Sequence, residues 1–244
     1  MMLDAQRVEW RDECASTNTS LREQAEAGAP SGRVLVADRQ TAGRGRCGRV
    51  WQSSPEGSLT FSVLYKEGEG ALSGLSLAVG LALLRALEKL GARALRLKWP
   101  NDLLCQKNGE DAKLAGVLIE RAGDAIIIGI GLNLKAPDLP GEVTAGLEDC
   151  LETPAAKPAL LAAIVGELDV MWADFCARGF APLCADWQAH HVWQGKSVRL
   201  MEEGRVLAEG ICRGVTDDGA LRLATADGER TFWAGDLRLR AGEH

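Results

Sequence analysis

The middle of the chain constrains the fold most, because several predicted strands follow one another there with only short turns between them. Residues 95–99 alternate apolar and basic side chains, as in a half-buried strand. Two further stretches, 103–106 and 113–120, flank Asn108-Gly109, a strong signal for a hairpin turn, and 125–134 is apolar enough for a central strand. Consecutive strands joined by turns do not form a doubly wound parallel sheet, because parallel neighbours need a long crossover.

The other segments predict helices that cover this sheet. We therefore expect the α+β class, with a mixed, mostly antiparallel sheet and helices on one face. Apolar content and Gly or Pro punctuation place helices at 17–28, 71–90, 158–178 and 181–190, and strands at 33–38 and 59–65.

The character of the sequence changes after Trp193. About fifty residues there carry short strand-like runs separated by Gly and Asp turns, which is typical of a small β-barrel. This pattern predicts two domains, residues 1–191 and residues 192–244. The expected strands of the second domain are 197–201, 205–213, 220–224, 230–233 and 236–240.

Composition and charge exclude several classes of function. The formal net charge of -6 argues against broad nucleic-acid binding, so any basic site must be local. No signal-peptide pattern begins the chain, and polar residues interrupt its longest apolar stretch, 71–90, so no membrane span is expected. The seven cysteines include no C-x-x-C pair and suggest reduced thiols. These features together predict a cytoplasmic protein.

A loop of glycines and arginines at 43–51 is the clearest candidate for an anion site. It contains Gly-x-Gly-x-x-Gly, but residues 51–55 are not a helix start, which rejects a dinucleotide site. Arg44, Arg46 and Arg49 could form forked hydrogen bonds to phosphate or carboxylate. A solvated basic turn is the alternative. Trp51 could stack on an adenine or belong to the core.

Five short motifs in register carry a resemblance to a known family. Their order and spacing closely resemble those of biotin–protein ligases, and the last fifty residues look like that family's SH3-like domain. The resemblance implies a catalytic domain of the class II aminoacyl-tRNA synthetase-like fold. Only about fifteen residues precede Ser16, so a monofunctional type without the N-terminal DNA-binding domain is expected. The motifs are Ser16-Thr17-Asn18, Gln40-Thr41-Ala42-Gly43-Arg44-Gly45-Arg46, Lys98-Trp99-Pro100-Asn101-Asp102, Lys113-Leu114-Ala115-Gly116 and Gly129-Ile130-Gly131-Leu132-Asn133.

The resemblance also implies an activity and its partners. Family members use ATP and Mg²⁺ to convert biotin to biotinyl-5′-AMP and then transfer biotin to one lysine of a biotin carboxyl carrier domain. The expected partners are therefore the carrier, biotin and ATP, with neither nucleic acid nor membrane. Whether the chain forms a homodimer stays open at this point.

The resemblance also implies a role for individual residues in these motifs. Lys113, Arg46 and Asp102 are the implied catalytic residues, with Asp102 either binding Mg²⁺ or acting on the acceptor lysine. The implied biotin-binding residues are Ser16, Thr17, Asn18, Gln40, Gly43, Arg44, Gly45, Arg46 and Lys113. The implied ATP-binding residues are Arg46, Arg49, Trp51, Lys98, Asn101, Gly116 and Asn133.

Two alternative functions remain. A lipoate or octanoate ligase or transferase shares the fold and an acyl-to-lysine reaction, but those families lack the Gly-Arg-Gly-Arg loop. A non-catalytic module that binds anions or nucleic acid would use the arginine loop alone. It would leave the Ser-Thr-Asn, Lys and Asn-Asp motifs without a role.

Overall fold

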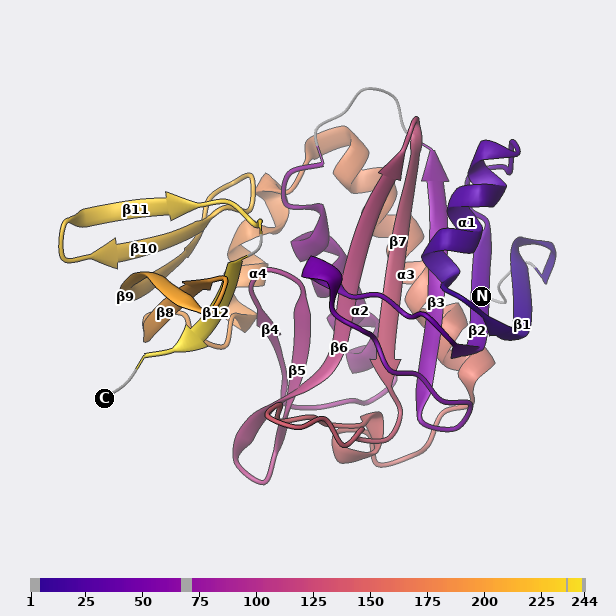
Figure 1. Ribbon diagram of the computed structural model, residues 1–244, viewed down its shortest axis with the longest axis horizontal. Coiled ribbons are helices and arrows are strands. Elements are labelled where there is room, and N and C mark those ends of the chain that lie inside the picture. The colour runs from indigo at the N-terminus through magenta and orange to yellow at the C-terminus, as the bar shows by residue number, and fades with distance from the viewer. Residues whose placement is uncertain (1–4, 67–71, 236, 243–244) are drawn as a thin grey trace.

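The computed structural model describes residues 5–66, 72–235 and 237–242, and within these ranges the strands form two sheets. Figure 1 shows the larger sheet beside the helices, with the smaller sheet at the C-terminal end. Residues 71 and 236, which the sequence places at the start of a helix and of a strand, lie outside the described residues.

The larger sheet has the strand order β1-β2-β3-β7-β6-β5-β4 across the described residues. Neighbouring strands are antiparallel except for β1 and β2, which are parallel. The predicted mixed, mostly antiparallel sheet is therefore confirmed. The strands are β1 (Val8–Cys14), β2 (Val34–Gln40), β3 (Ser58–Lys66), β4 (Leu95–Lys98), β5 (Asp102–Lys107), β6 (Glu110–Ala122) and β7 (Ala125–Asn133).

The turn between β5 and β6 has the predicted hairpin geometry. Asn108 and Gly109 both have positive φ, at 53° and 84°, as a two-residue type I′ turn requires. A second tight turn joins β6 to β7, which is buried along its whole length in the middle of the sheet. Because β5, β6 and β7 are consecutive hairpin neighbours, the motifs on them are held at fixed distances from one another.

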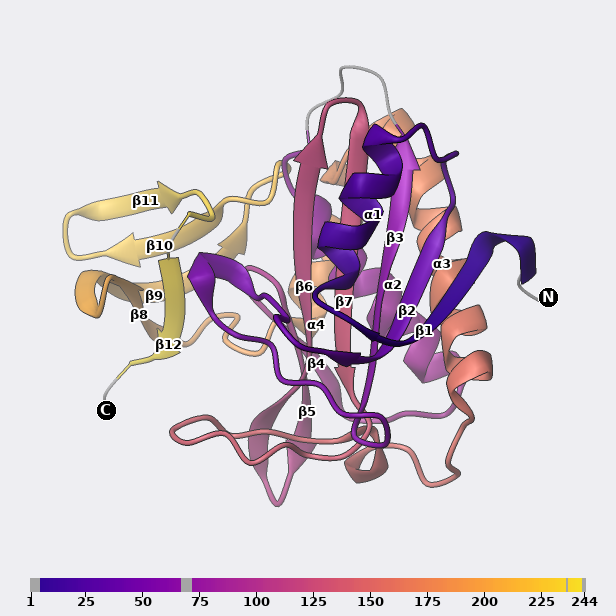
Figure 2. The same cartoon turned by 45° about the vertical axis from the view of Figure 1, so that its right-hand side comes forward.

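Helices cover both faces of the larger sheet. α2 (Leu75–Lys89) and α3 (Lys157–Arg178) pack together against one face over the main apolar core. α1 (Thr17–Glu26) lies on the opposite face (Figure 2). There Leu21 packs on Leu35, Leu64 and Ile127. The expectation of helices on one face misses α1, because its low apolar content gave no sign of the small second core beneath it.

Strand β1 is an element that the sequence analysis did not predict. It lies at the edge of the sheet and pairs with β2 along Val8–Cys14. Four of its seven residues are charged, so the apolar alternation that reveals a strand is weak. Long-range pairing with β2, rather than local preference, decides its conformation.

The smaller sheet is antiparallel, with the order β11-β10-β9-β8-β12 across the described residues. Its side chains join the main apolar core, and Trp99 Nε1 donates to the Gly219 carbonyl at 3.1 Å across the junction. A short helix, α4 (Cys184–His190), leads into it. The strands are β8 (Ser197–Glu202), β9 (Arg205–Val215), β10 (Leu221–Thr225), β11 (Gly228–Phe232) and β12 (Leu237–Ala241).

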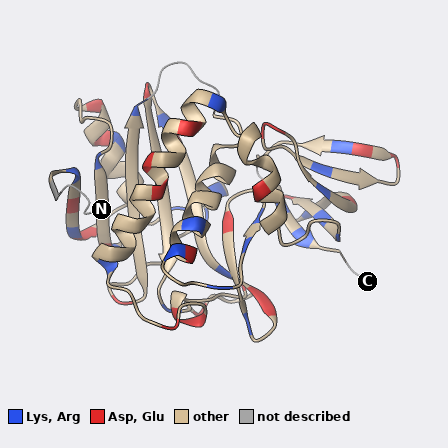
Figure 3. Ribbon diagram, turned by 180° about the vertical axis from the view of Figure 1, so that it is seen from behind, with Lys and Arg blue, Asp and Glu red and all other residues tan. Residues whose placement is uncertain are grey.

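The rear face shows mixed charge. Acidic and basic segments are interspersed along its helices (Figure 3). Across the described ranges, no helix is both long and apolar enough to cross a membrane.

Candidate active site

A cavity of about 270 Å³ lies between the larger sheet, the glycine and arginine loop, and β12. Every residue that the sequence assigns to biotin, ATP or catalysis lines it, except Gly43. Gly43 lies behind a lining residue, because its carbonyl accepts the Trp51 backbone N–H at 2.9 Å. A Cβ at Gly43 would lie 2.4 Å from the Trp51 carbonyl oxygen, so only glycine allows this close approach.

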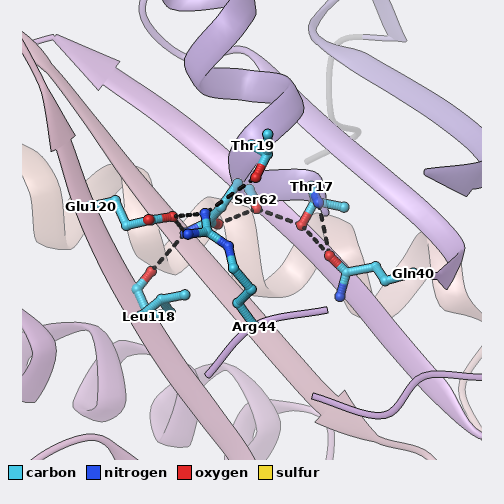
Figure 4. A network of polar contacts seen from close by, with 8 residues as sticks. Thr17, Thr19, Gln40, Arg44, Ser62, Leu118 and Glu120 are labelled. Carbon is cyan, nitrogen blue, oxygen red and sulfur yellow. Dashed lines mark hydrogen bonds and ion pairs between the residues drawn. The ribbon is translucent and has the colours of Figure 1, made fainter. Parts of the chain in front are cut away.

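One end of the cavity is neutral and rich in hydrogen bonds (Figure 4). Gln40 Oε1 accepts from the Thr17 backbone N–H at 2.8 Å and lies 3.2 Å from the Thr17 hydroxyl. The Ser62 hydroxyl lies 2.6 Å from both Thr17 Oγ1 and Asn18 Oδ1. Thr17, Asn18 and Ser62 are buried. This network can recognise a compact group that has both donors and acceptors.

Ser16 stands at the N-cap of α1 but does not use its side chain as a cap. Its backbone is extended, and its carbonyl accepts the Ser20 N–H at 3.0 Å, while its hydroxyl makes no capping hydrogen bond. Ser16 is buried and lines the cavity, so its hydroxyl is not used to cap the helix.

Glycines on β6 and β7 form the floor of the cavity. Gly116 and Gly131 are directly paired in the sheet, and the Trp51 indole lies against both. A Cβ on Gly131 would lie 2.1 Å from Trp51 Cε2, and one on Gly116 would lie 3.3 Å from Trp51 Cζ3. Trp51 therefore occupies space that only glycines leave open, and its Nε1 has no hydrogen-bond partner among the described residues.

The loop itself is a tight turn closed at its base. Arg44 and Val50 form an isolated antiparallel bridge, and the Gly45 N–H donates to the Arg49 carbonyl at 2.7 Å. Cys47 and Gly48 follow at its tip with φ of 56° and 68°. This turn directs the arginines toward the cavity from one side.

The arginines reach different walls of the cavity. Arg44 Nη2 pairs with Glu120 at 2.9 Å, and Arg46 Nη1 donates to Asn101 Oδ1 at 3.1 Å. Arg46 also donates to the Gly235 carbonyl, which lies just before β12 in the smaller sheet. Buried Arg49 Nε has no acceptor among the described residues.

Two lysines face Asp102 on the floor beside the loop. Lys113 Nζ lies 3.0 Å from Asp102 Oδ1, and Lys98 Nζ lies 4.0 Å from Asp102 Oδ2. Burial lowers the pKa of Lys98 to about 8, against the opposing effect of Asp102. Asn133 Nδ2 donates to the Lys113 carbonyl at 3.3 Å, which ties the end of β7 to this group.

The cavity also includes residues that the sequence analysis missed. Arg238 and Arg240 on β12 line it and add positive charge. Behind the cavity wall, Glu120 and Ser62 hold the Asn18 amide through hydrogen bonds to Nδ2 and Oδ1. No local signal marks them, since each is a single polar side chain on an ordinary strand, and only the sheet pairing brings them to the site.

Comparison with known proteins identifies the class. The model of the biotin/lipoate A/B protein ligase family matches residues 12–133, and the chain belongs to this family. The model of the biotin protein ligase C terminal domain matches residues 195–240. The resemblance inferred from the five motifs is therefore confirmed.

Curated relatives agree with this assignment. The bifunctional ligase/repressor BirA of Escherichia coli is 34% identical over 223 residues, covering 87% of this chain and 68% of that protein. A biotin–[acetyl-CoA-carboxylase] ligase of Mycobacterium tuberculosis is 34% identical over 236 residues, covering 91% of this chain and 85% of the relative.

Solved structures match over nearly the whole chain. The biotin protein ligase of Aquifex aeolicus, in complex with biotin and ATP, superposes with a TM-score of 0.84 at 31% identity, covering 97% of this chain and 100% of that one. The Leishmania major enzyme, in complex with biotinyl-5-AMP, gives a TM-score of 0.67 at 26% identity, covering 93% and 99%.

Proposed function

We propose that this protein is a biotin–protein ligase, which activates biotin with ATP and transfers it to a lysine of a biotin carboxyl carrier domain. One observation carries the proposal: a single cavity joins a neutral hydrogen-bonding end at Thr17, Asn18 and Gln40 to a cationic end at Arg46 and Lys113. This polarity matches biotin, whose urea ring is neutral and whose carboxylate must meet a phosphate.

The first half-reaction brings two anions together. The biotin carboxylate attacks the α-phosphorus of ATP and expels pyrophosphate. Arg46 and Lys113, at the cationic end, would offset the repulsion between the anions and stabilise the charge that develops on the leaving group. This local positive charge also explains how a chain of net charge -6 can bind a nucleotide.

Mg²⁺ is the expected companion of ATP, and the donor set is compatible with it. Across the described ranges, no three His, Cys, Asp or Glu side chains gather into a metal cluster, but Mg²⁺ at nucleotide sites often uses one or two carboxylates with phosphates and waters. Asp102 would hold the ion, with Glu142 lining the same cavity. The ion would neutralise charge on the phosphates.

The second half-reaction forms the amide bond. The neutral ε-amine of the acceptor lysine attacks the acyl carbon of biotinyl-5′-AMP, and AMP leaves with the bonding electron pair. Asp102 would orient that amine and accept a proton from it. Asp102 pairs with Lys113 at 3.0 Å, so the candidate base lies beside the candidate phosphate-binding lysine in the same cavity.

The test is pyrophosphate exchange into ATP with biotin, lipoate or neither added. Biotin-dependent exchange is expected, because the dithiolane ring of lipoate has neither an N–H donor nor a carbonyl acceptor to satisfy the polar end of the cavity. Exchange with lipoate alone would assign the chain to the lipoate branch of the family. If neither biotin nor lipoate supports exchange, the result would favour a binding module without catalysis.

A further inference from the structure

We infer that Glu120 is a positioning residue for recognition of the ligand's neutral head, acting through the Asn18 amide and the Arg44 guanidinium. The inference rests on the proposed function, since it assigns the head of biotin to the end of the cavity at Asn18. It adds a residue that lies outside the five sequence motifs.

One carboxylate oxygen of Glu120 serves two groups at once (Figure 4). Glu120 Oε2 accepts from Asn18 Nδ2 at 2.7 Å and from Arg44 Nη2 at 2.9 Å. Arg44 Nη2 also lies 3.2 Å from Thr19 Oγ1 on α1. Glu120 on β6 therefore links the loop to the first turn of α1, and its side chain is only 23% exposed.

The Glu120 carboxylate determines the orientation of the Asn18 side-chain amide. An ionised carboxylate only accepts hydrogen bonds, so the Nδ2 group of Asn18 must face it. Asn18 Nδ2 also lies 3.4 Å from the Leu118 carbonyl, a second acceptor on the same side. Oδ1 is thereby turned to Ser62, and its remaining lone pair is left for a ligand N–H.

The Asn18 amide is also closely packed. It is buried against the backbone of β7 at Gly129, where a Cβ would lie 2.2 Å from Oδ1. Glu120 opposes a reversal of this amide, because its carboxylate offers no donor to Oδ1. Glutamine at position 120 presents either a donor or an acceptor, so it would permit both orientations and remove the charge that holds Arg44.

The first test compares Glu120→Gln with Glu13→Gln, a control whose carboxylate pairs with Arg39 at 3.4 Å on the edge strand β1. In pyrophosphate exchange we expect Glu120→Gln to raise the KM for biotin by about tenfold, the size expected for a hydrogen bond to a charged group. kcat and the KM for ATP should stay within about twofold. Glu13→Gln should match the unmodified chain in all three.

A second test exchanges the hydrogen-bond donor and acceptor between positions 18 and 120. Asn18→Asp alone sets two carboxylates face to face, whereas Asn18→Asp combined with Glu120→Gln lets the glutamine amide donate to the aspartate. We expect the double variant to have a lower KM for biotin than Asn18→Asp alone. Thermal unfolding midpoints of all variants establish that each is folded.

The outcomes separate the two proposals. An unchanged biotin KM in folded Glu120→Gln, strictly additive effects in the double variant, or an equal rise in the ATP KM would overturn the role of Glu120 alone. Absence of biotin-dependent exchange in the unmodified chain would overturn the proposed function and this inference with it.

Discussion

At the scale of single residues, Lys113 and Asp102 hold each other in position inside the cavity. They form an ion pair at 3.0 Å inside the cavity, beside Lys98 and beneath Trp51, whose ring centre lies 5.8 Å from Lys113 Nζ. An ammonium group that is already desolvated and paired loses little when it exchanges one anion for another. The ion pair thus holds the Lys113 ammonium group in place beside Asp102.

Lys113→Ala should reduce biotin-dependent pyrophosphate exchange by about a hundredfold or more, because it removes a positive charge from the reacting carboxylate and phosphate. Initial rates of exchange at saturating biotin and ATP measure this. The matched control is Lys135→Ala, an exposed lysine that pairs with Glu56 at 3.3 Å, and it should retain full activity. A near-normal rate in Lys113→Ala would remove this lysine from the mechanism.

At the scale of elements, the arginine loop and the glycine floor are fitted to each other. Trp51 ends the loop and lies on Gly116 and Gly131, while Arg46 reaches across to Asn101 and to the smaller sheet at Gly235. The loop thereby lines one side of the cavity and connects the two sheets. We expect it to shield an acyl adenylate from water, which destroys such an anhydride.

Arg46→Ala should release the adenylate about tenfold faster, since it removes charge-assisted hydrogen bonds from the loop. Hydroxylamine traps free biotinyl-5′-AMP, so the rate of hydroxamate formation without acceptor measures the release. Arg39→Ala, on an exposed arginine that pairs with Glu13, is the control. Equal trapping rates for the two variants would show that Arg46 does not retain the adenylate.

Gly131→Ala should displace Trp51 from the floor, because the new Cβ would lie 2.1 Å from the ring. The KM for both substrates should rise by about tenfold or more, given that a small misplacement in a site has large effects. The control is Gly166→Ala in α3, where a Cβ meets nothing within 4 Å. It should stabilise the protein by about 0.5–1 kcal/mol in thermal or urea unfolding, since alanine favours a helix. Unaltered kinetics in Gly131→Ala would contradict the observed packing of Trp51.

On the scale of the whole molecule, the two sheets share one apolar core and meet at a buried histidine. His191 stacks on Trp187 with ring centres 4.7 Å apart, and its Nδ1 lies 3.7 Å from Cys212 Sγ in β9. Burial lowers the pKa of His191 from 6.5 to about 3. The junction is thus built around a neutral imidazole.

This junction should make stability depend on pH. Between pH 6.5 and about 3 the unfolded chain binds a proton at His191 and the folded chain does not, so the free energy of unfolding falls as the pH is lowered. The slope from one such group is at most about 1.4 kcal/mol per pH unit. Urea unfolding from pH 7 to 4 should show a shallower decline for His191→Phe than for the unmodified chain. Identical slopes in His191→Phe and the unmodified chain would refute the role of His191.

Much of this architecture could be predicted from the sequence. Local patterns located the hairpin at Asn108-Gly109, the central strand β7 and the strands of the smaller sheet, because strand alternation and turn residues act over short distances. The five motifs also identified the family. The residues that these motifs assign to biotin, ATP or catalysis all line one cavity, except Gly43.

Only the tertiary structure decided the rest, because it depends on pairing between distant segments. Charged β1 becomes a strand by joining β2, and α1 crosses to the second face over Leu35 and Ile127. Glu120 reaches Asn18 across 102 positions of the chain, and Arg46 reaches Gly235 across 189. Sequence patterns record local periodicity and short motifs, whereas contacts of this range arise only when the sheets assemble.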